Sequence, residues 1–308
     1  MKKEMSNMKH IIEVISEAMA EEPKPIKTGI KGLDELIGGY YPGELTTVCG
    51  RENVGKTAFI VHQVNRMAID LGLETYMYTS YANERVWLSM MAAYYCGIQT
   101  GDLHAVLYSP MYADAVKEYL EKLKEAPLFV EFGFKKAFSL EHVMDVIKRE
   151  HVKIAFFDDA MWLGDDGTTL KRLAVECGIP VVATTWTWLN GRDSLEGHRV
   201  FLTDLTRDTG CYGSDVVIGM VDFEADRIFV DDSGRDLRGA IEMEVLKHKG
   251  KQKQSRFWID KSSLYAREHS KEKRELILNE MVEQNPRVSS SMSKLGLRLG
   301  DSDDVSLD

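Results

Sequence analysis

The chain has few of the features that mark secreted, membrane or zinc-binding proteins. Its four cysteines in 308 residues are far apart and form no CxxC pair, which argues against a zinc motif or a disulfide framework. No apolar run approaches the roughly 20 residues that a membrane-spanning helix needs. The N-terminal stretch has no secretion-signal core, because Glu13, Ser16 and Glu17 interrupt it. These absences predict a cytoplasmic protein with no membrane partner.

Positive charge is also scarce. The 39 lysines and arginines are outnumbered by 49 aspartates and glutamates, for a net charge of −10. A surface that is basic all round is therefore excluded, and composition gives no support for a nucleic-acid partner. Nucleic-acid binding through a local basic strip inside a channel stays open.

Apolar segments alternate between strand and helix patterns from residue 26 onward. Such alternation predicts an α/β fold with a mostly parallel sheet covered on both faces. The late strands follow one another without helices, so that edge of the sheet is expected to be antiparallel. Strands are expected at residues 45–49, 74–78, 128–132, 154–157, 181–185, 216–220, 241–246 and 257–260, and helices at 57–70, 84–95, 140–149 and 168–177.

Residues 50–57 read GRENVGKT and fit the phosphate-loop pattern GxxxxGK[ST] at every fixed position. Such a loop wraps a phosphate with inward-pointing backbone N–H groups, and its glycines permit the close approach. Lys56 supplies a cation for the β- and γ-phosphates, and Thr57 offers a hydroxyl to Mg²⁺. The sequence therefore predicts ATP or a related nucleotide, bound by Gly50, Arg51, Glu52, Asn53, Val54, Gly55, Lys56, Thr57 and Ala58.

Two adjacent acidic residues, Asp158 and Asp159, follow the apolar run IAFF. Ligands of an open α/β sheet bind at the carboxyl ends of its parallel strands, and Mg²⁺ prefers oxygen ligands. We expect Asp158 to hold Mg²⁺ together with Thr57, with Asp159 as the alternative ligand.

These segments resemble the C-terminal motor domain of DnaB-type replicative helicases. The similarity runs through IKTGIKGLDELIGGYYPGELTTVCGRENVGKTAF, LKRLAVECGIPVVATT, FLTDL, SDVVIGM and IEMEVLKHKGKQKQSRFWID. The resemblance implies a RecA-like P-loop ATPase fold that binds ATP and Mg²⁺. It also implies a helicase or translocase that acts on single-stranded DNA in replication or recombination, as a ring of identical subunits with a hexamer favoured.

The resemblance covers roughly residues 26–265, and together with the change of composition after residue 269 it divides the chain into three parts. Residues 1–25 would be an N-terminal linker helix and tether, 26–269 the RecA-like domain, and 270–308 a helical extension with an acidic, disordered tail. The apolar spacing of residues 8–20 predicts a helix that either caps its own domain or docks on a neighbouring copy. In the family a linker helix at this place packs on the next subunit, which favours docking.

Several positions depart from the family pattern. The glutamate that polarises the attacking water in the family falls on Ser80, and Glu84, one helical turn further on, is the expected substitute. The family's glutamine sensor falls on Trp186. Its arginine finger, which reaches into the neighbouring subunit's site, falls in Lys247-His248-Lys249, where lysine keeps the charge and loses the bidentate fork. The expected catalytic residues are Lys56, Glu84 and Lys249, with Lys247 as a second finger residue.

The segments expected to face DNA differ as well. Residues 164–167 read GDDG, and their carboxylates would repel a phosphate backbone. Residues 190–201 keep Arg192 and Arg199 as candidate DNA contacts. Two hypotheses follow: an ATP-driven helicase, or a nucleotide-binding module with poor hydrolysis that controls assembly or a partner.

Overall fold

The structure is a computed structural model, and it describes residues 10–12, 23–80, 83–98, 106–133, 138–160, 167–187, 198–205, 211–231, 234–249 and 255–260. The chain divides into two units, residues 1–266 and 267–308, and every described residue belongs to the first. Most of the expected N-terminal helix and all of the expected C-terminal extension lie outside the described residues. Among those described, no helix is long and apolar enough to cross a membrane.

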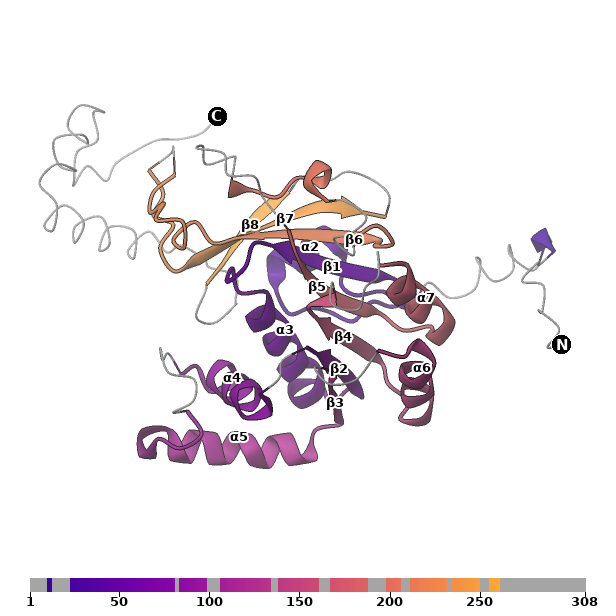
Figure 1. The fold of residues 1–308 in the computed structure, drawn as a ribbon, viewed down its shortest axis with the longest axis horizontal. Helices are drawn as coiled ribbons and strands as arrows, with labels where there is room; N and C mark the ends of the chain where they lie inside the picture. Colours follow the sequence, from indigo (N-terminus) through magenta and orange to yellow (C-terminus); the bar gives the residue numbers. More distant parts are fainter. Residues whose placement is uncertain are drawn as a thin grey trace, which may run out of the picture. The chain divides into compact units, whose positions relative to one another are not determined.

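A single eight-stranded sheet forms the centre of the first unit, in the order β3-β2-β4-β5-β1-β6-β7-β8 (Figure 1). Strands β3 to β6 in this order run parallel, whereas β7 and β8 are antiparallel to their neighbours. This arrangement confirms the mostly parallel sheet with an antiparallel edge. The strands are β1 Leu45–Gly50, β2 Thr75–Thr79, β3 Leu128–Phe132, β4 Ile154–Asp158, β5 Val181–Trp186, β6 Val216–Val221, β7 Ala240–His248 and β8 Arg256–Asp260.

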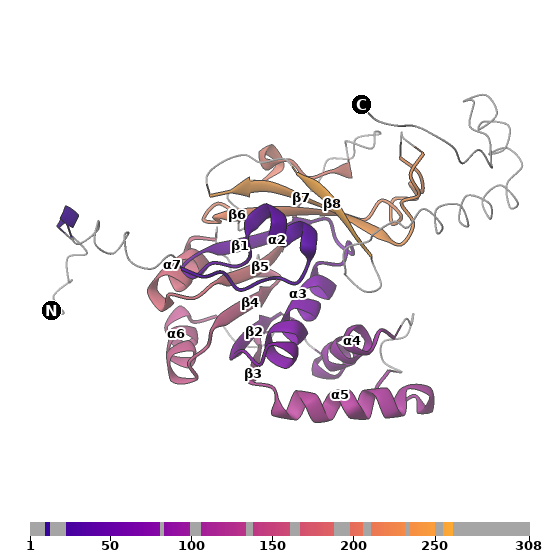
Figure 2. The same cartoon turned by 180° about the vertical axis from the view of Figure 1, so that it is seen from behind.

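Helices cover both faces of the sheet (Figures 1 and 2). On one face pack α2 Lys31–Ile37, α3 Lys56–Asn65, α4 Glu84–Cys96 and α5 Ala113–Glu125, and on the other pack α6 Leu140–Arg149 and α7 Thr168–Cys177. Successive strand residues point to opposite faces of the sheet. Phe156 therefore packs in the core beneath α2 to α5, and Phe157 packs in the core beneath α6 and α7. Burial on both faces explains why β4 is apolar throughout its first four residues.

Two helices were not expected from the sequence. Helix α2 has seven residues, too few for a clear pattern. Helix α5 is rich in charge, yet its buried Val116 and Tyr119 are three residues apart and face the core. The expected helix 57–70 is divided into α3 and a π-helical turn, Arg66–Asp70.

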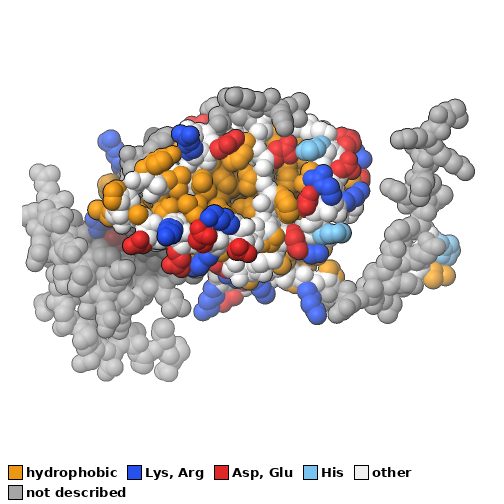
Figure 3. Space-filling model, turned by 90° about the horizontal axis from the view of Figure 1, so that it is seen from below, with side chains coloured by type: hydrophobic (Ala, Val, Ile, Leu, Met, Phe, Trp, Pro, Cys, Tyr) orange, Lys and Arg blue, Asp and Glu red, His pale blue; other side chains and the backbone are white. Residues whose placement is uncertain are grey.

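Strand β3 ends the sheet on one side, and each of its five residues is half-buried. Figure 3 looks onto this side of the molecule and shows a broad gathering of hydrophobic side chains bordered by charged ones. At the opposite edge, β8 is the last strand.

Strand β1 lies between β5 and β6, in the middle of the sheet. Its last residue, Gly50, pairs with Trp186 at the end of β5. Because β1, β4, β5 and β6 are parallel, their carboxyl ends share one edge of the sheet, and the loops that follow them meet there.

Candidate functional site

The loop between β1 and α3 turns sharply at two of its residues. Gly55 and Asn53 both have a left-handed backbone, with φ of 95° and 62°. A Cβ atom on Gly50 would lie 2.6 Å from the carbonyl oxygen of Met220 in β6, so only glycine fits there. Helix α3 begins at Lys56, which places its first N–H groups at the loop. This geometry suits a phosphate.

Lys56 holds the loop through its ammonium group, which donates to the carbonyl oxygens of Gly50 at 3.0 Å and Arg51 at 2.6 Å. Burial lowers the pKa of Lys56, and the nearby carboxylates of Asp159 and Asp158 oppose that shift. A partly buried cation at the start of a helix suits a bound anion.

Asp158 ends β4 and is 2% exposed. Its Oδ1 accepts from the hydroxyl of Thr184 at 2.8 Å and from that of Thr57 at 3.3 Å. Burial raises the pKa of Asp158 to about 6, while the two hydroxyl donors and Lys56 act in the opposite direction. The structure thus brings together Thr57 and Asp158, the two expected Mg²⁺ ligands.

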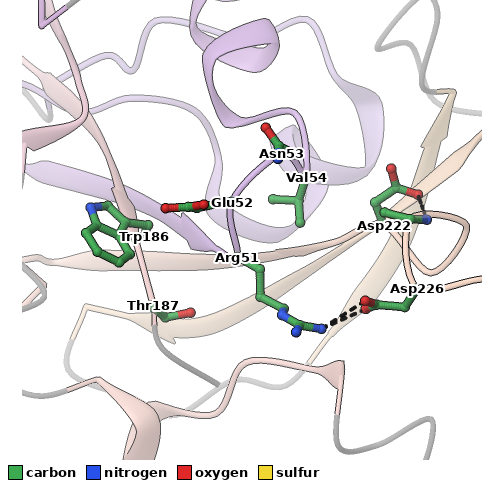
Figure 4. Close-up of a pocket in the computed structure, with 9 residues that line it drawn as sticks. Arg51, Glu52, Asn53, Val54, Trp186, Thr187, Asp222 and Asp226 are labelled. Carbon is green, nitrogen blue, oxygen red and sulfur yellow. Dashed lines mark hydrogen bonds and ion pairs between the residues drawn. The ribbon is translucent and has the colours of Figure 1, made fainter. Parts of the chain in front are cut away.

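Two adjoining hollows lie at this edge of the sheet, with volumes of about 360 and 210 Å³. Figure 4 shows the larger one, with the phosphate loop on one side and Asp222 and Asp226 on the other. The larger is lined by Arg51, Glu52, Asn53, Val54, Trp186, Thr187, Asp222, Ala225 and Asp226. The smaller is lined by Glu52, Asn53, Lys56, Thr57, Ser80, Asp158, Asp159, Thr184 and Trp186.

The smaller hollow fits a Mg²⁺-bound triphosphate. It combines a lysine for phosphate oxygens with a hydroxyl and a carboxylate for the metal. Among the described residues, no group of three or more His, Cys, Asp or Glu side chains could hold a metal ion. Mg²⁺ is usually held by one or two carboxylates together with substrate phosphates and water molecules.

Glu84, the expected substitute for the family's glutamate, lies elsewhere. The side chain of Asn83 accepts from the N–H groups of Arg85 and Val86, and this cap starts α4 at an exposed Glu84. Glu84 lines neither hollow, whereas Ser80 lines the smaller one. Glu84 therefore does not line the site, and its role as a substitute for the family's glutamate stays a prediction. Trp186 lines both hollows.

Lys247 and Lys249 lie at the other end of the sheet from the phosphate loop. The N–H of Lys249 donates to Asp215 O, and the N–H of Asp215 donates to the oxygen of Leu45, the first residue of β1. The five residue steps from Leu45 to Gly50 span roughly 17 Å of strand. Lys249 Nζ lies 3.8 Å from the centre of the Tyr41 ring and 3.7 Å from Glu44 Oε1. Lys247 Nζ donates to Ser214 O.

Arg199 is not on a surface that could meet DNA. Its side chain is 8% exposed, and it donates from Nε and Nη2 to Glu242 at 2.6 and 2.9 Å. The guanidinium also packs against Phe223, with 5.4 Å between its carbon and the ring centre. The expected DNA contact at Arg199 is therefore replaced by a buried ion pair. Arg192, the other candidate, lies outside the described residues, as do residues 164–166.

Sequence reasoning missed several residues of the site, among them Thr184, Asp222 and Asp226. Asp222 follows β6 directly, so the rule that placed ligands after β4 could have identified it. Asp226 comes four residues later, and no pattern in the sequence marks it. Thr184 lies inside β5, and its role depends on the pairing of β5 with β4, which the sequence does not state.

Comparison with known proteins agrees with this geometry. Residues 25–159 match the family of the DnaB-like helicase C-terminal domain. The replicative DNA helicase DnaB of Nostoc sp. (strain PCC 7120 / SAG 25.82 / UTEX 2576) is 22% identical over 208 residues, covering 63% of this chain and 23% of that protein. The replicative DNA helicase DnaB of Treponema pallidum (strain Nichols) is 25% identical over 210 residues, covering 63% of this chain and 47% of that protein. The chain thus spans less than half the length of either relative.

Two solved structures share the fold. One of them, an ATPase domain, superposes with a TM-score of 0.67 at 13% identity, over 84% of this chain and 96% of that one. A DnaB-like replicative helicase, solved in a study of its interactions with primase, superposes with a TM-score of 0.65 at 13% identity, over 81% of this chain and 63% of that one. The phosphate loop, the sheet and the family match agree: residues 25–159 are similar to the DnaB-like helicase C-terminal domain, and the chain shares the fold of these two solved structures.

Proposed function

We propose that this chain is an ATP-driven motor that moves along or unwinds single-stranded DNA, as a ring of identical subunits. The observation that carries the proposal is the convergence of Lys56, Thr57 and Asp158 on one hollow at the carboxyl edge of the sheet. The lysine suits the phosphate oxygens, and the hydroxyl and the carboxylate suit a metal ion. A site that binds only an anion would not need the carboxylate.

Each residue has a distinct task in this proposal. The loop amides and Lys56 bind the β- and γ-phosphates of ATP, while Thr57 and Asp158 hold Mg²⁺. When bound, Mg²⁺ neutralises charge on the phosphate oxygens. Asn53 and Gly55 supply the left-handed turns that let the loop wrap the phosphates.

The position of Lys247 and Lys249 supports a ring. They lie at the opposite end of the sheet from their own phosphate loop, so within one chain they cannot contact its nucleotide. In a ring of head-to-tail subunits, each interface joins two different surfaces of the chain, so a residue far from its own nucleotide site can lie at the site of the neighbour. Lys249 would then supply positive charge to the neighbour's nucleotide, weaker than an arginine because it lacks the planar fork.

The test is ATP turnover by the whole chain, with and without single-stranded DNA. Lys56→Ala is the loss-of-binding variant, and Lys148→Ala, an exposed lysine on α6, is the matched control. We expect turnover that DNA stimulates, that Lys56→Ala abolishes and that Lys148→Ala leaves unchanged. ATP binding without turnover in either condition would exclude the motor.

A second function has support of its own. Ser80 replaces the family's glutamate, and Glu84 lies outside both hollows. These two observations favour a module that binds ATP and hydrolyses it poorly, using nucleotide occupancy to control assembly. In that case, size-exclusion chromatography should show nucleotide-dependent oligomers in the absence of turnover.

A further inference from the structure

The smaller hollow contains a serine where the family's carboxylate would be, and it contains another carboxylate nearby. Ser80 follows β2, and Asp159 follows β4. Strands β2 and β4 are parallel neighbours whose register pairs Thr79 with Asp158. Ser80 and Asp159 are therefore the first residues beyond the ends of two adjacent strands, which are about 4.8 Å apart. Both line the hollow that holds Lys56 and Thr57.

The backbone of Asp159 is fixed in an uncommon conformation. Its φ is 63°, in the left-handed region, where Asp and Asn are tolerated better than most residues. Its N–H donates to the hydroxyl oxygen of Thr184 at 2.8 Å, and that hydroxyl donates to Asp158. Thr184 thus contacts both aspartates at the point where the chain leaves β4.

Two other carboxylates line the hollow and are less suited to meet a water molecule. Asp158 is buried and already accepts from Thr57 and Thr184, as a metal ligand would. Glu52 is part of the phosphate loop itself and is exposed. Burial lowers the pKa of Lys56. Of the charged groups that oppose this shift, Asp159 has the largest effect.

We propose that Asp159 is the catalytic carboxylate of this chain, orienting and polarising the attacking water in place of residue 80. The inference rests on the proposed ATP hydrolysis. The water oxygen forms a bond to the γ-phosphorus while the bond from that phosphorus to the bridging oxygen breaks. The electron pair of the broken bond leaves with ADP, and the proton lost by the water ends on the released phosphate.

Asp159→Asn is the test variant. Asparagine has the same size and shape as aspartate, lacks its negative charge, and accepts a left-handed backbone. Its turnover number should fall by about 10²-fold or more, the usual contribution of such a group. Two binding measurements separate catalysis from affinity. ADP with beryllium fluoride, which resembles bound ATP, should keep its Kd within about threefold. ADP with aluminium fluoride, which resembles the transition state, should bind at least about tenfold more weakly.

The register of β2 and β4 provides a rescue experiment. Ser80→Glu in the Asp159→Asn background places a carboxylate just after the end of β2, beside residue 159, and should restore turnover by at least about tenfold. Asp145→Asn, at an exposed position of α6, is the matched control for loss of a carboxylate. If Asp159 only held the metal, a glutamate at position 80 would not restore turnover.

Three results would overturn the inference. Unchanged turnover in Asp159→Asn would remove Asp159 from the reaction and leave the motor intact. Equal loss of binding for both fluoride complexes would make Asp159 a nucleotide or metal ligand. A wild-type chain that binds ATP without turnover, and gains turnover in Ser80→Glu alone, would exclude both the motor and a catalytic Asp159.

Discussion

Arg51 Nη1, inside the phosphate loop, donates to both carboxylate oxygens of Asp226, at 3.0 and 2.9 Å, although the two residues are 175 positions apart in sequence. His198 Nδ1 lies 2.7 Å from Asp226 Oδ2. One carboxylate therefore joins the loop after β1, the loop after β6 and the chain segment that precedes the 3-10 helix Leu202–Asp204.

The Arg51–Asp226 pair is partly exposed, so we expect a modest coupling. In a double-mutant cycle of Arg51→Gln and Asp226→Asn, the coupling free energy of unfolding should be about 0.5–1 kcal/mol. It should shrink in 1 M salt, because salt screens exposed charges. Urea unfolding of the four proteins at low and high salt measures it, and strictly additive effects would show that the pair contributes no coupling.

The buried pair of Arg199 and Glu242 should matter more for stability. Arg199→Ala leaves a carboxylate that is 2% exposed without its guanidinium partner, which should lower the free energy of unfolding by about 3–5 kcal/mol. Replacing both residues, as in Arg199→Met with Glu242→Leu, should recover much of the loss. Denaturant unfolding gives both values. A stable Arg199→Ala protein that has lost DNA binding would instead restore Arg199 as a DNA contact.

Gly50 and Gly219 provide a matched pair in adjacent strands. A Cβ atom at residue 50 would lie 2.6 Å from a backbone oxygen of β6, whereas one at residue 219 would meet the end of Leu246 at 3.3 Å. Gly50→Ala should lower the free energy of unfolding by about 1–3 kcal/mol, and Gly219→Ala by less than about 1 kcal/mol. Thermal unfolding compares them, and equal losses would contradict the close approach.

His62 in α3 should make the protein less stable in mild acid. Burial, assisted by the charge of Arg66, lowers the pKa of His62 to about 4. The unfolded chain takes up this proton near pH 6.5 and the folded chain does not, so stability falls as the pH drops from about 6.5 to 4. The loss attributable to His62 should reach at most about 3 kcal/mol.

His62→Gln removes that contribution, so the variant should have a flatter stability curve in this pH window. Asp158 acts with the opposite sign, because its raised pKa favours protonation in the fold. That effect is common to both proteins and cancels in the difference between their urea unfolding curves. Parallel curves from pH 7 to pH 4 would mean that His62 takes up its proton in the fold as easily as in the unfolded chain.

Trp186 should report nucleotide binding, because it lines both hollows. We expect ADP with Mg²⁺ to change the tryptophan fluorescence, and Trp186→Phe to remove most of that change. Trp258→Phe is the control, since Trp258 packs on Phe223 with ring centres 6.0 Å apart, outside the residues that line the hollows. A full signal in Trp186→Phe would place the bound nucleotide away from this residue.

Features with a local cause were predicted well from the sequence. The loop GRENVGKT depends on residue spacing alone, and the buried strands depend on short apolar runs, so both could be placed within a few residues. The antiparallel edge followed from the lack of helices between late strands. The coming together of Thr57 and Asp158 followed from the shared edge of parallel strands.

Features that depend on distant partners were not predicted. Thr184 binds Asp158 because β5 lies beside β4, and Asp226 binds Arg51 because the loop after β6 returns to the site. Arg199 is in a segment that reads as a polar loop, and only the fold provides Glu242 as its buried partner. Glu84 is one turn beyond the expected position, but Asn83 caps the helix in a way that leaves it exposed.

The position of β1 has a consequence for dividing the chain. The match to the DnaB-like family ends at residue 159, yet both hydrogen-bonding neighbours of β1, Val181–Trp186 and Val216–Val221, come after that point. A fragment cut at residue 159 would contain the whole phosphate loop on a strand with two unpaired edges, a template for aggregation. The matched region, residues 25–159, is therefore not a folding unit, and the shortest piece that encloses the loop between its neighbours extends at least to Val221.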